Sequence, residues 1–235
     1  MQAARLDIGL ALRQSFQALR ADALGIGKGG LLLVVLPSLL VRLLAPEGGY
    51  GPDVATLVTT LRAVLAMLFV SLVSWGVVAR LAGLPLPPEA FFAQGLRRAQ
   101  PGLKVALLVG AAIVFGLILR LFATHGTPAG FMLQTLLLTL GLWALCTLMP
   151  AVPVAVVERL GPVDALKRAA ALTAGNRDRT LLLGLLLALV IGIGALLISR
   201  ATDAAPALEA AFELLAWGVA AIVPSVVYAG LRIPQ

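Results

Sequence analysis

The residues with the clearest chemical character form a short basic segment between two long apolar runs. Residues 161–179, the basic segment, carry four cations: Lys167, Arg168, Arg177 and Arg179. Such cations attract anionic lipid headgroups by about 1 kcal/mol each at low salt. Lys and Arg also accumulate in the cytoplasmic loops of membrane proteins, where they orient the neighbouring spans. We therefore expect a surface helix that faces lipid headgroups. A second interpretation, compatible with the first, is that these cations only orient the neighbouring span.

Two further segments share this basic character. Residues 5–24 place apolar side chains three or four positions apart, with basic and amide side chains on the other side, which is typical of an amphipathic helix in the headgroup layer. A solvated helix that only caps the bundle is the alternative. Another pair of arginines precedes the third apolar run. The four arginines expected at the lipid surface here are Arg13, Arg20, Arg97 and Arg98.

Catalytic chemistry is poorly represented in the chain. Hydrolysis needs a nucleophile with a positioned base, paired carboxylates or a metal ion. The chain has one histidine, His125, and one cysteine, Cys146, and no cluster of residues with metal-ligand spacing or Gly-rich phosphate loop. We therefore expect a non-enzymatic protein without a catalytic site, a metal site or a cofactor.

The composition indicates the class of protein that positions these groups. Sixty per cent of the residues are hydrophobic, 12% are charged and the mean hydropathy is +1.02. Soluble domains average about 45 to 50% apolar and about 25% charged residues. The sequence therefore predicts an all-α integral membrane protein. In such a protein the net charge of +7 indicates cations kept on the cytoplasmic side, so we expect no nucleic-acid partner.

Apolar runs predict six membrane spans, because a helix needs about 20 residues to cross the hydrocarbon layer. The predicted spans cover residues 29–45, 59–82, 103–123, 130–157, 180–199 and 212–231. Three prolines fall inside them and are candidate hinges: Pro150, Pro153 and Pro224. The alternative, which we favour, is that the first two produce a fixed kink that turns the chain onto the membrane surface.

The distribution of cations predicts the orientation. Fourteen of the eighteen Lys and Arg residues fall on one side of the predicted spans. The other four lie near span ends on the opposite side: Arg42, Arg62, Arg120 and Arg200. Both termini are therefore expected in the cytoplasm, in a bacterial cytoplasmic membrane. Glu213 is expected to pair with one of the four opposite-side arginines.

The layout suggests an internal repeat within one transmembrane domain of residues 1–235. Each pair of spans follows a basic or amphipathic segment, which gives units of about 1–82, 83–158 and 159–235. A Trp and a Pro seven residues apart recur in the fourth and sixth spans, as Trp143 with Pro150 and Trp217 with Pro224. Units with an even number of crossings share one orientation, so the repeats are predicted to be parallel. Chance matching in a Leu-rich sequence is the alternative.

Two local features also lead to expectations. Thr-Ala-Gly-Asn at 173–176 is expected to end a helix, with Gly175 or Asn176 in a left-handed cap. Gly184, Ala188 and Gly192 recur every four residues in the fifth span, which predicts close packing against another helix of the same chain.

One stretch resembles a known family. It contains Pro150-x-x-Pro153, the sequence VVERLGPVDALKR at 156–168, Leu-Thr at 172–173 and Gly-Asn at 175–176. This pattern resembles the YciC-like bacterial inner-membrane proteins, which are related to the membrane domain attached to some glycerophosphodiester phosphodiesterases. The resemblance implies a multi-span, all-helical protein without an established activity.

The chain departs from that family in two places. Ala169 and Ala170 stand where the family commonly has Ser and an aromatic residue, and no aromatic residue lies near Asp178. The chain has no catalytic phosphodiesterase domain, so the enzymatic name does not carry over.

Two functions follow as hypotheses. The first is a non-enzymatic protein of envelope or lipid-related organisation, or an accessory subunit of a membrane complex. Its expected partners are anionic lipids and, for an accessory subunit, a membrane protein. The second is a transporter or channel for small molecules or lipids, with a path between the three repeats and the prolines as hinges.

Overall fold

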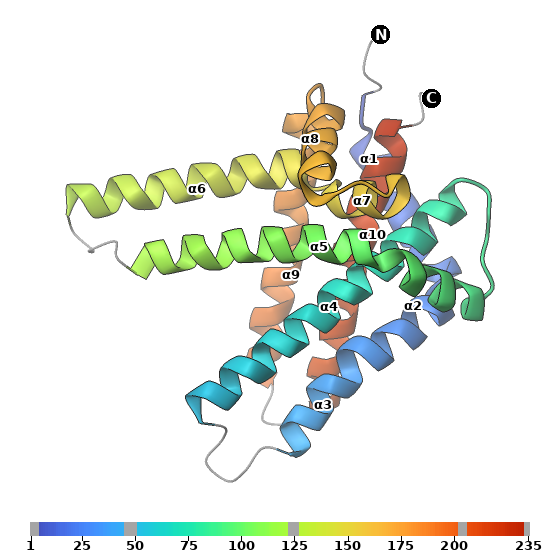
Figure 1. Ribbon diagram of the computed structural model, residues 1–235, viewed down its shortest axis with the longest axis horizontal. Coiled ribbons are helices and arrows are strands. Elements are labelled where there is room, and N and C mark those ends of the chain that lie inside the picture. The colour runs from blue at the N-terminus through green and yellow to red at the C-terminus, as the bar shows by residue number, and fades with distance from the viewer. Residues whose placement is uncertain (1–4, 45–50, 122–126, 202–205, 233–235) are drawn as a thin grey trace.

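A computed structural model describes residues 5–44, 51–121, 127–201 and 206–232, and within them the secondary structure is helical, without a strand (Figure 1). One element, η1, is a π-helix. In chain order the elements are α1 Ile8–Ala21, α2 Ala23–Gly30, η1 Leu31–Val35, α3 Leu36–Leu43, α4 Pro52–Leu81, α5 Pro88–Leu121, α6 Pro128–Leu148, α7 Ala151–Glu158, α8 Pro162–Thr173, α9 Arg177–Ala201 and α10 Pro206–Arg232.

Six helical stretches among the described residues are long and apolar enough to cross a membrane. They are Ala23–Val41, Asp53–Leu81, Pro88–Gly116, Pro128–Glu158, Arg177–Ile198 and Leu208–Arg232. This confirms the prediction of a six-span, multi-pass helical membrane protein. The first stretch starts six residues earlier than predicted, because α2 follows α1 after a single turn residue, Asp22.

The first span contains a π-helical stretch for a local reason. Pro37 has no N–H, and its ring would clash with the carbonyl four residues earlier in a regular α-helix. The chain widens just before it, and the Leu36 N–H bonds to the Leu31 carbonyl, which is the i to i+5 pattern of a π-helix. The widened turn keeps α2, η1 and α3 in one continuous helical run.

The amphipathic helix predicted at 5–24 is α1, and it buries mainly small side chains within the protein. Ala11, Ser15 and Ala18 are buried, whereas Leu12 and Phe16 are exposed. α1 packs along α10, and small side chains allow the two backbones to approach closely. Leu12 and Phe16 therefore remain on the outer surface of the protein, whereas Ile8 and Leu19 are partly buried against the core.

The second unit has no separate surface helix. The predicted segment ahead of the third span is continuous with it in α5, which runs through Pro101. The neighbouring Ala99 and Gly102 are buried, and a Cβ at Gly102 would meet Val156 and Ser71. Packing on both sides of the proline keeps the helix continuous, where local propensity alone favours a break.

A buried hub joins the helices. α7 contacts α4, α5, α8 and α10, and its residues Val154, Ala155 and Val156 are fully buried. In Figure 1 the α5–α6 hairpin extends to the left, whereas the α3–α4 and α9–α10 hairpins both extend toward the bottom of the view. Their outer portions expose many apolar side chains. In the most apolar stretch of α9, only 11% is buried within the protein. Such surfaces suit contact with lipid chains.

Candidate functional site

The eight cations predicted at the lipid surface divide into two groups. Six have exposed side chains: Arg13, Arg20, Arg97, Lys167, Arg168 and Arg177. These belong to α1, the first part of α5, α8 and the start of α9. The exposed Arg168 and the half-buried Arg98 and Arg179 make contacts within the protein, so the charge pattern of the sequence mixed two kinds of residue.

The three inward contacts differ in chemistry. The Arg98 guanidinium lies 3.8 Å from the centroid of the Trp75 ring, within the range of a cation–π interaction. Arg168 Nε donates to Glu158 Oε2 at 3.3 Å. Arg179 contacts the N-terminal segment. These residues join elements of the protein to one another.

The N-terminal segment is fastened to the corner between α8 and α9. The Leu6 N–H donates to Asn176 Oδ1 at 2.7 Å, and Arg179 Nη1 donates to the Leu6 carbonyl at 2.6 Å. Asn176 is buried and starts α9, where its carbonyl accepts from the Thr180 N–H. Both hydrogen-bonding groups of Leu6 are therefore used by a segment 170 residues later in the chain.

The left-handed cap predicted at Gly175 or Asn176 is wrong. Positive φ angles occur elsewhere in the described residues, at Gly83 with φ 80° and at Arg159 with φ 55°. The corner closes instead with a hydrogen bond from the Asn176 N–H to the Thr173 carbonyl at 2.9 Å. The next helix begins at once, which leaves no space for the residues of a left-handed cap.

The break ahead of α7 is held by hydroxyl groups. α6 ends at Leu148 and α7 begins at Ala151, with Pro150 at the N-cap of α7. Pro150 has no N–H for the Cys146 carbonyl four residues earlier. Thr180 Oγ1 donates to that carbonyl at 2.7 Å, and Thr173 Oγ1 lies 3.1 Å from the carbonyl oxygen of the next residue, Thr147.

The other candidate hinges occupy different positions. Pro153 is buried in the first turn of α7, where a helix does not need its N–H. Pro224 lies inside α10, which continues through it to Arg232. Their role as hinges stays a prediction.

A second polar group lies at the end of α7. Glu158, the last residue of α7, accepts from the Tyr228 hydroxyl at 3.0 Å through Oε1 and from Arg168 through Oε2. The Tyr228 side chain is fully buried in α10, and Arg232 lies 5.7 Å from its ring centroid. One carboxylate thus links α7, α8 and α10.

A buried carboxylate also fixes the turn between α1 and α2. The Asp22 side chain is 4% exposed, and both of its oxygens accept from Arg80, with Arg80 Nε to Oδ2 at 2.6 Å. Bidentate pairing compensates the burial of the carboxylate. The pair fastens the last turn of α4 to the turn that starts the first span.

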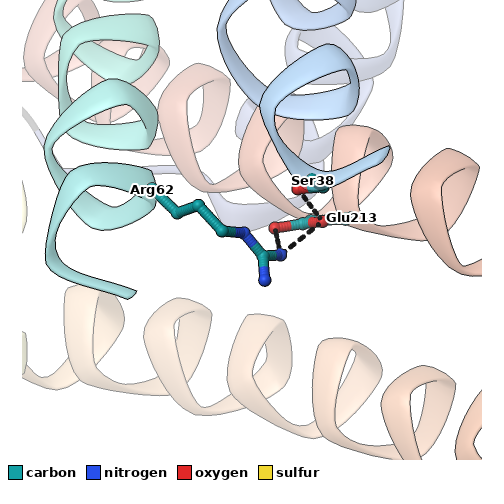
Figure 2. Close-up of polar contacts among 3 residues, drawn as sticks. All are labelled: Ser38, Arg62 and Glu213. Carbon is teal, nitrogen blue, oxygen red and sulfur yellow. Dashed lines mark hydrogen bonds and ion pairs between the residues drawn. The ribbon is translucent and has the colours of Figure 1, made fainter. Parts of the chain in front are cut away.

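A polar cluster joins α3, α4 and α10, as Figure 2 shows. Arg62 Nη2 donates to both Glu213 oxygens at 3.0 and 3.2 Å, and the Ser38 hydroxyl donates to Glu213 Oε2 at 2.8 Å. The prediction that Glu213 pairs with an opposite-side arginine is confirmed, and the partner is Arg62. The Arg62 Nε is buried without a hydrogen bond.

The small-residue pattern of α9 is explained only in part. A Cβ at Gly184 would contact Leu145 of α6, so this glycine does allow close helix packing. Ala188 is exposed, and a Cβ at Gly192 would meet nothing within 4 Å. Intramolecular packing is therefore the wrong explanation for these two positions. α9 does approach α10 beyond them, where a Cβ at Gly194 would overlap Phe212.

Comparison with family models, with curated proteins and with solved structures found no match. The resemblance to the YciC-like proteins therefore stays a prediction. Within the described part of the chain, no three His, Cys, Asp or Glu residues are grouped so that they could hold a metal ion.

Sequence reasoning missed the residues that organise the polar contacts, namely Asp22, Asn176, Thr173 and Thr180. One signal could have pointed to the threonines. A proline inside a span implies an unpaired carbonyl four residues earlier, and a nearby hydroxyl is a suitable donor. No comparable signal identifies the partner of Asn176, because that contact spans 170 residues.

Proposed function

We propose that the chain is a non-enzymatic protein of the bacterial cytoplasmic membrane that contacts anionic lipid through its basic surface. Its role is in envelope or lipid-related organisation, or as an accessory subunit of a membrane complex. The observation that supports this proposal is the exposure of Arg13, Arg20, Arg97, Lys167 and Arg177. These exposed cations remain available to lipid phosphates, whereas Arg98, Arg168 and Arg179 already make contacts within the protein.

We further propose that both termini are cytoplasmic and that the chain consists of three parallel units. The two described ends lie together, since a Cβ at Gly230 would be 3.7 Å from Leu6 Cδ1. A short helix followed by a sharp corner precedes the first and the fifth span, at Asp22 and at Asn176. The continuous α5 is the exception among the three units.

Packing at the meeting point of the helices favours this function over transport. The core residues Phe69, Leu72, Val73 and Val77 of α4 are fully buried, and they pack with Ile222 of α10. A transport path between the units requires a polar or water-filled lining, and an apolar core at this position does not provide one.

The test compares binding of the purified protein to vesicles of phosphatidylglycerol and of phosphatidylcholine. A Lys167→Gln, Arg177→Gln variant removes two exposed cations. We expect its affinity for the anionic vesicles to fall about fivefold for each cation removed. Binding to phosphatidylcholine vesicles should not change. The comparison should be made at low salt, because ions screen surface charge.

Asp164→Asn is the matched control. Asp164 is exposed on α8, the helix of Lys167, and its neutralisation makes the surface more positive. This variant should bind anionic vesicles at least as tightly as the unmodified protein. Unchanged binding by the double variant would contradict a role of the basic surface in lipid contact.

A further inference from the structure

An apolar groove of about 270 Å³ lies where α1, α2 and α10 meet. Its apolar lining includes Phe16 and Leu19 of α1, Ile26 of α2, and Leu214 and Leu215 of α10. One charged residue, Arg20, also lines the groove, and no carboxylate does. The groove thus combines an apolar wall with a single exposed cation.

Two features keep the groove open. The turn at Asp22, held by Arg80, sets α1 at an angle to α2, so the two helices do not close against each other. Gly27 lies in the wall, and a Cβ at this position would meet nothing within 4 Å. A larger residue at Gly27 would therefore project into free space without displacing a neighbour.

The dimensions restrict the occupant. Pockets for drug-sized ligands measure about 300 to 1,000 Å³, so this groove is smaller than most of them. An α-helix with side chains is at least about 10 Å wide, and one turn of it would fill more than this volume. A single flexible hydrocarbon chain fits an open groove of this size better than a partner helix.

Charge complementarity then indicates which kind of lipid binds. A guanidinium group forms strong, directional hydrogen bonds with phosphate oxygens. Arg20 is exposed at a groove that is otherwise lined by apolar residues and glycine. We propose that this groove binds one acyl chain of an anionic phospholipid and that Arg20 binds its phosphate. The site deepens the proposed lipid contact and rests on it. It is separate from the surface formed by Lys167 of α8 and Arg177 at the start of α9, which we call the α8 surface.

The first test fills the groove. Gly27→Phe places a ring in the space of the acyl chain, and Gly192→Phe places one at an equally open position on α9. Native mass spectrometry would count lipids retained in mild detergent from an equal mixture of phosphatidylglycerol and phosphatidylcholine. We expect Gly27→Phe to lose one bound phosphatidylglycerol and Gly192→Phe to retain it. Retention by a folded Gly27→Phe variant would overturn the proposal.

The second test removes the cation and does not depend on the fold of the first variant. Arg20→Gln should lose at least half of the preference for phosphatidylglycerol over phosphatidylcholine. Arg13→Gln, on the same helix but outside the groove, should keep that preference. An undiminished preference in Arg20→Gln would overturn the assignment of the phosphate to this residue.

The two proposals can fail separately. The Lys167→Gln, Arg177→Gln variant should bind anionic vesicles less tightly while it still retains the lipid of the groove. Loss of the retained lipid in that variant would overturn the groove as a distinct site. Unchanged vesicle binding together with groove-dependent retention would instead refute only the function proposed for the α8 surface.

Discussion

Single hydroxyl groups decide how the chain tolerates proline inside a span. Thr180 supplies the hydrogen bond that Pro150 cannot give to the Cys146 carbonyl. A buried carbonyl without a donor costs about 1 to 3 kcal/mol. The break between α6 and α7 therefore depends on residues that follow it in the chain.

Thr180→Val tests this dependence. The substitution keeps the shape of the side chain but leaves the Cys146 carbonyl without its donor, so we expect a loss of about 1 to 3 kcal/mol in the free energy of unfolding. Denaturant unfolding in detergent would measure it. Thr139→Val is the control, because Thr139 is exposed and donates only within its own helix, to the Thr135 carbonyl. Equal losses in the two variants would contradict the assigned role.

The Arg62–Glu213 pair is a second contact at the scale of residues. Its side chains are 34% and 26% exposed, within helices that face lipid. Removal of one partner leaves the other charge unpaired in an apolar setting, whereas removal of both does not. The effects of the two removals on the free energy of unfolding should therefore be strongly non-additive.

A double-mutant cycle measures that coupling. We expect Arg62→Met and Glu213→Gln each to lower the free energy of unfolding by about 1 to 3 kcal/mol. The double variant should lose clearly less than the sum of the two. Additive losses would mean that the pair contributes no coupling between α4 and α10. Ser38→Ala is a useful comparison, because it removes only the neutral donor of the cluster.

At the scale of elements, glycine determines how closely α4 and α5 approach. A Cβ at Gly76 would overlap the Phe91 ring, and a Cβ at Gly95 would overlap Leu72. Phe91 and Leu72 are themselves buried, so neither side chain has space to move away. The α4–α5 contact therefore depends on the absence of side chains at these positions.

Gly76→Ala should consequently destabilise the protein by about 1 to 3 kcal/mol through overpacking. Gly141→Ala is the matched control, because Gly141 is in α6, is exposed and has open space around its added Cβ. Its higher helix propensity should leave stability unchanged or raise it by up to about 1 kcal/mol. Comparable destabilisation by both variants would show that glycine acts through backbone flexibility instead of close packing.

Hydropathy and proline positions predicted the helices better than their connections. The six spans follow from the long apolar runs, and the break near Pro150 follows from the chemistry of proline. The continuity of α5 through Pro101 did not follow, because it depends on packing against Ser71 and Val156, which are distant in sequence. The buried face of α1 was also missed, because hydrophobicity alone does not favour Ala and Ser over Leu and Phe.

At the scale of the whole molecule, the order of the helices and the distribution of charge predict a definite orientation. The start of α4 and the α8 surface should lie on opposite sides of the membrane. Cys146 is buried and is the only cysteine, so a Cys146→Ser background provides a protein without thiols. Val54, near the start of α4, and Lys167 of α8 are both exposed and suit single-cysteine labelling.

In intact spheroplasts a membrane-impermeant maleimide should label Val54→Cys and spare Lys167→Cys. Permeabilisation should make Lys167→Cys reactive. These outcomes follow from the predicted orientation, in which fourteen of eighteen cations lie on the cytoplasmic side. Labelling of Lys167→Cys without permeabilisation would reverse the proposed orientation.

The sequence predicted which cations belong to the candidate site. It did not predict which of them contact other residues of the protein. Six of the eight cations predicted from the charge pattern are exposed, and three of the eight are engaged in contacts within the protein. Exposure depends on the neighbours that the fold supplies, such as Trp75 beside Arg98 and Leu6 beside Arg179. The apolar groove arises only when α1, α2 and α10 meet, so no single segment encodes it.

The π-helix η1 has a consequence for the angular phase of the first span. Each residue of an α-helix turns the following chain by about 100°. The wider turn at Leu31–Val35 accommodates one residue more than a regular turn, so it determines which face of α3 Ser38 occupies. If all five residues adopted a regular α-helical turn, Ser38 would rotate by about 100° away from Glu213. Deletion of one residue there would restore a regular helix and nearly keep this phase. The polar cluster thus depends on helical phase as well as on the identity of its three residues.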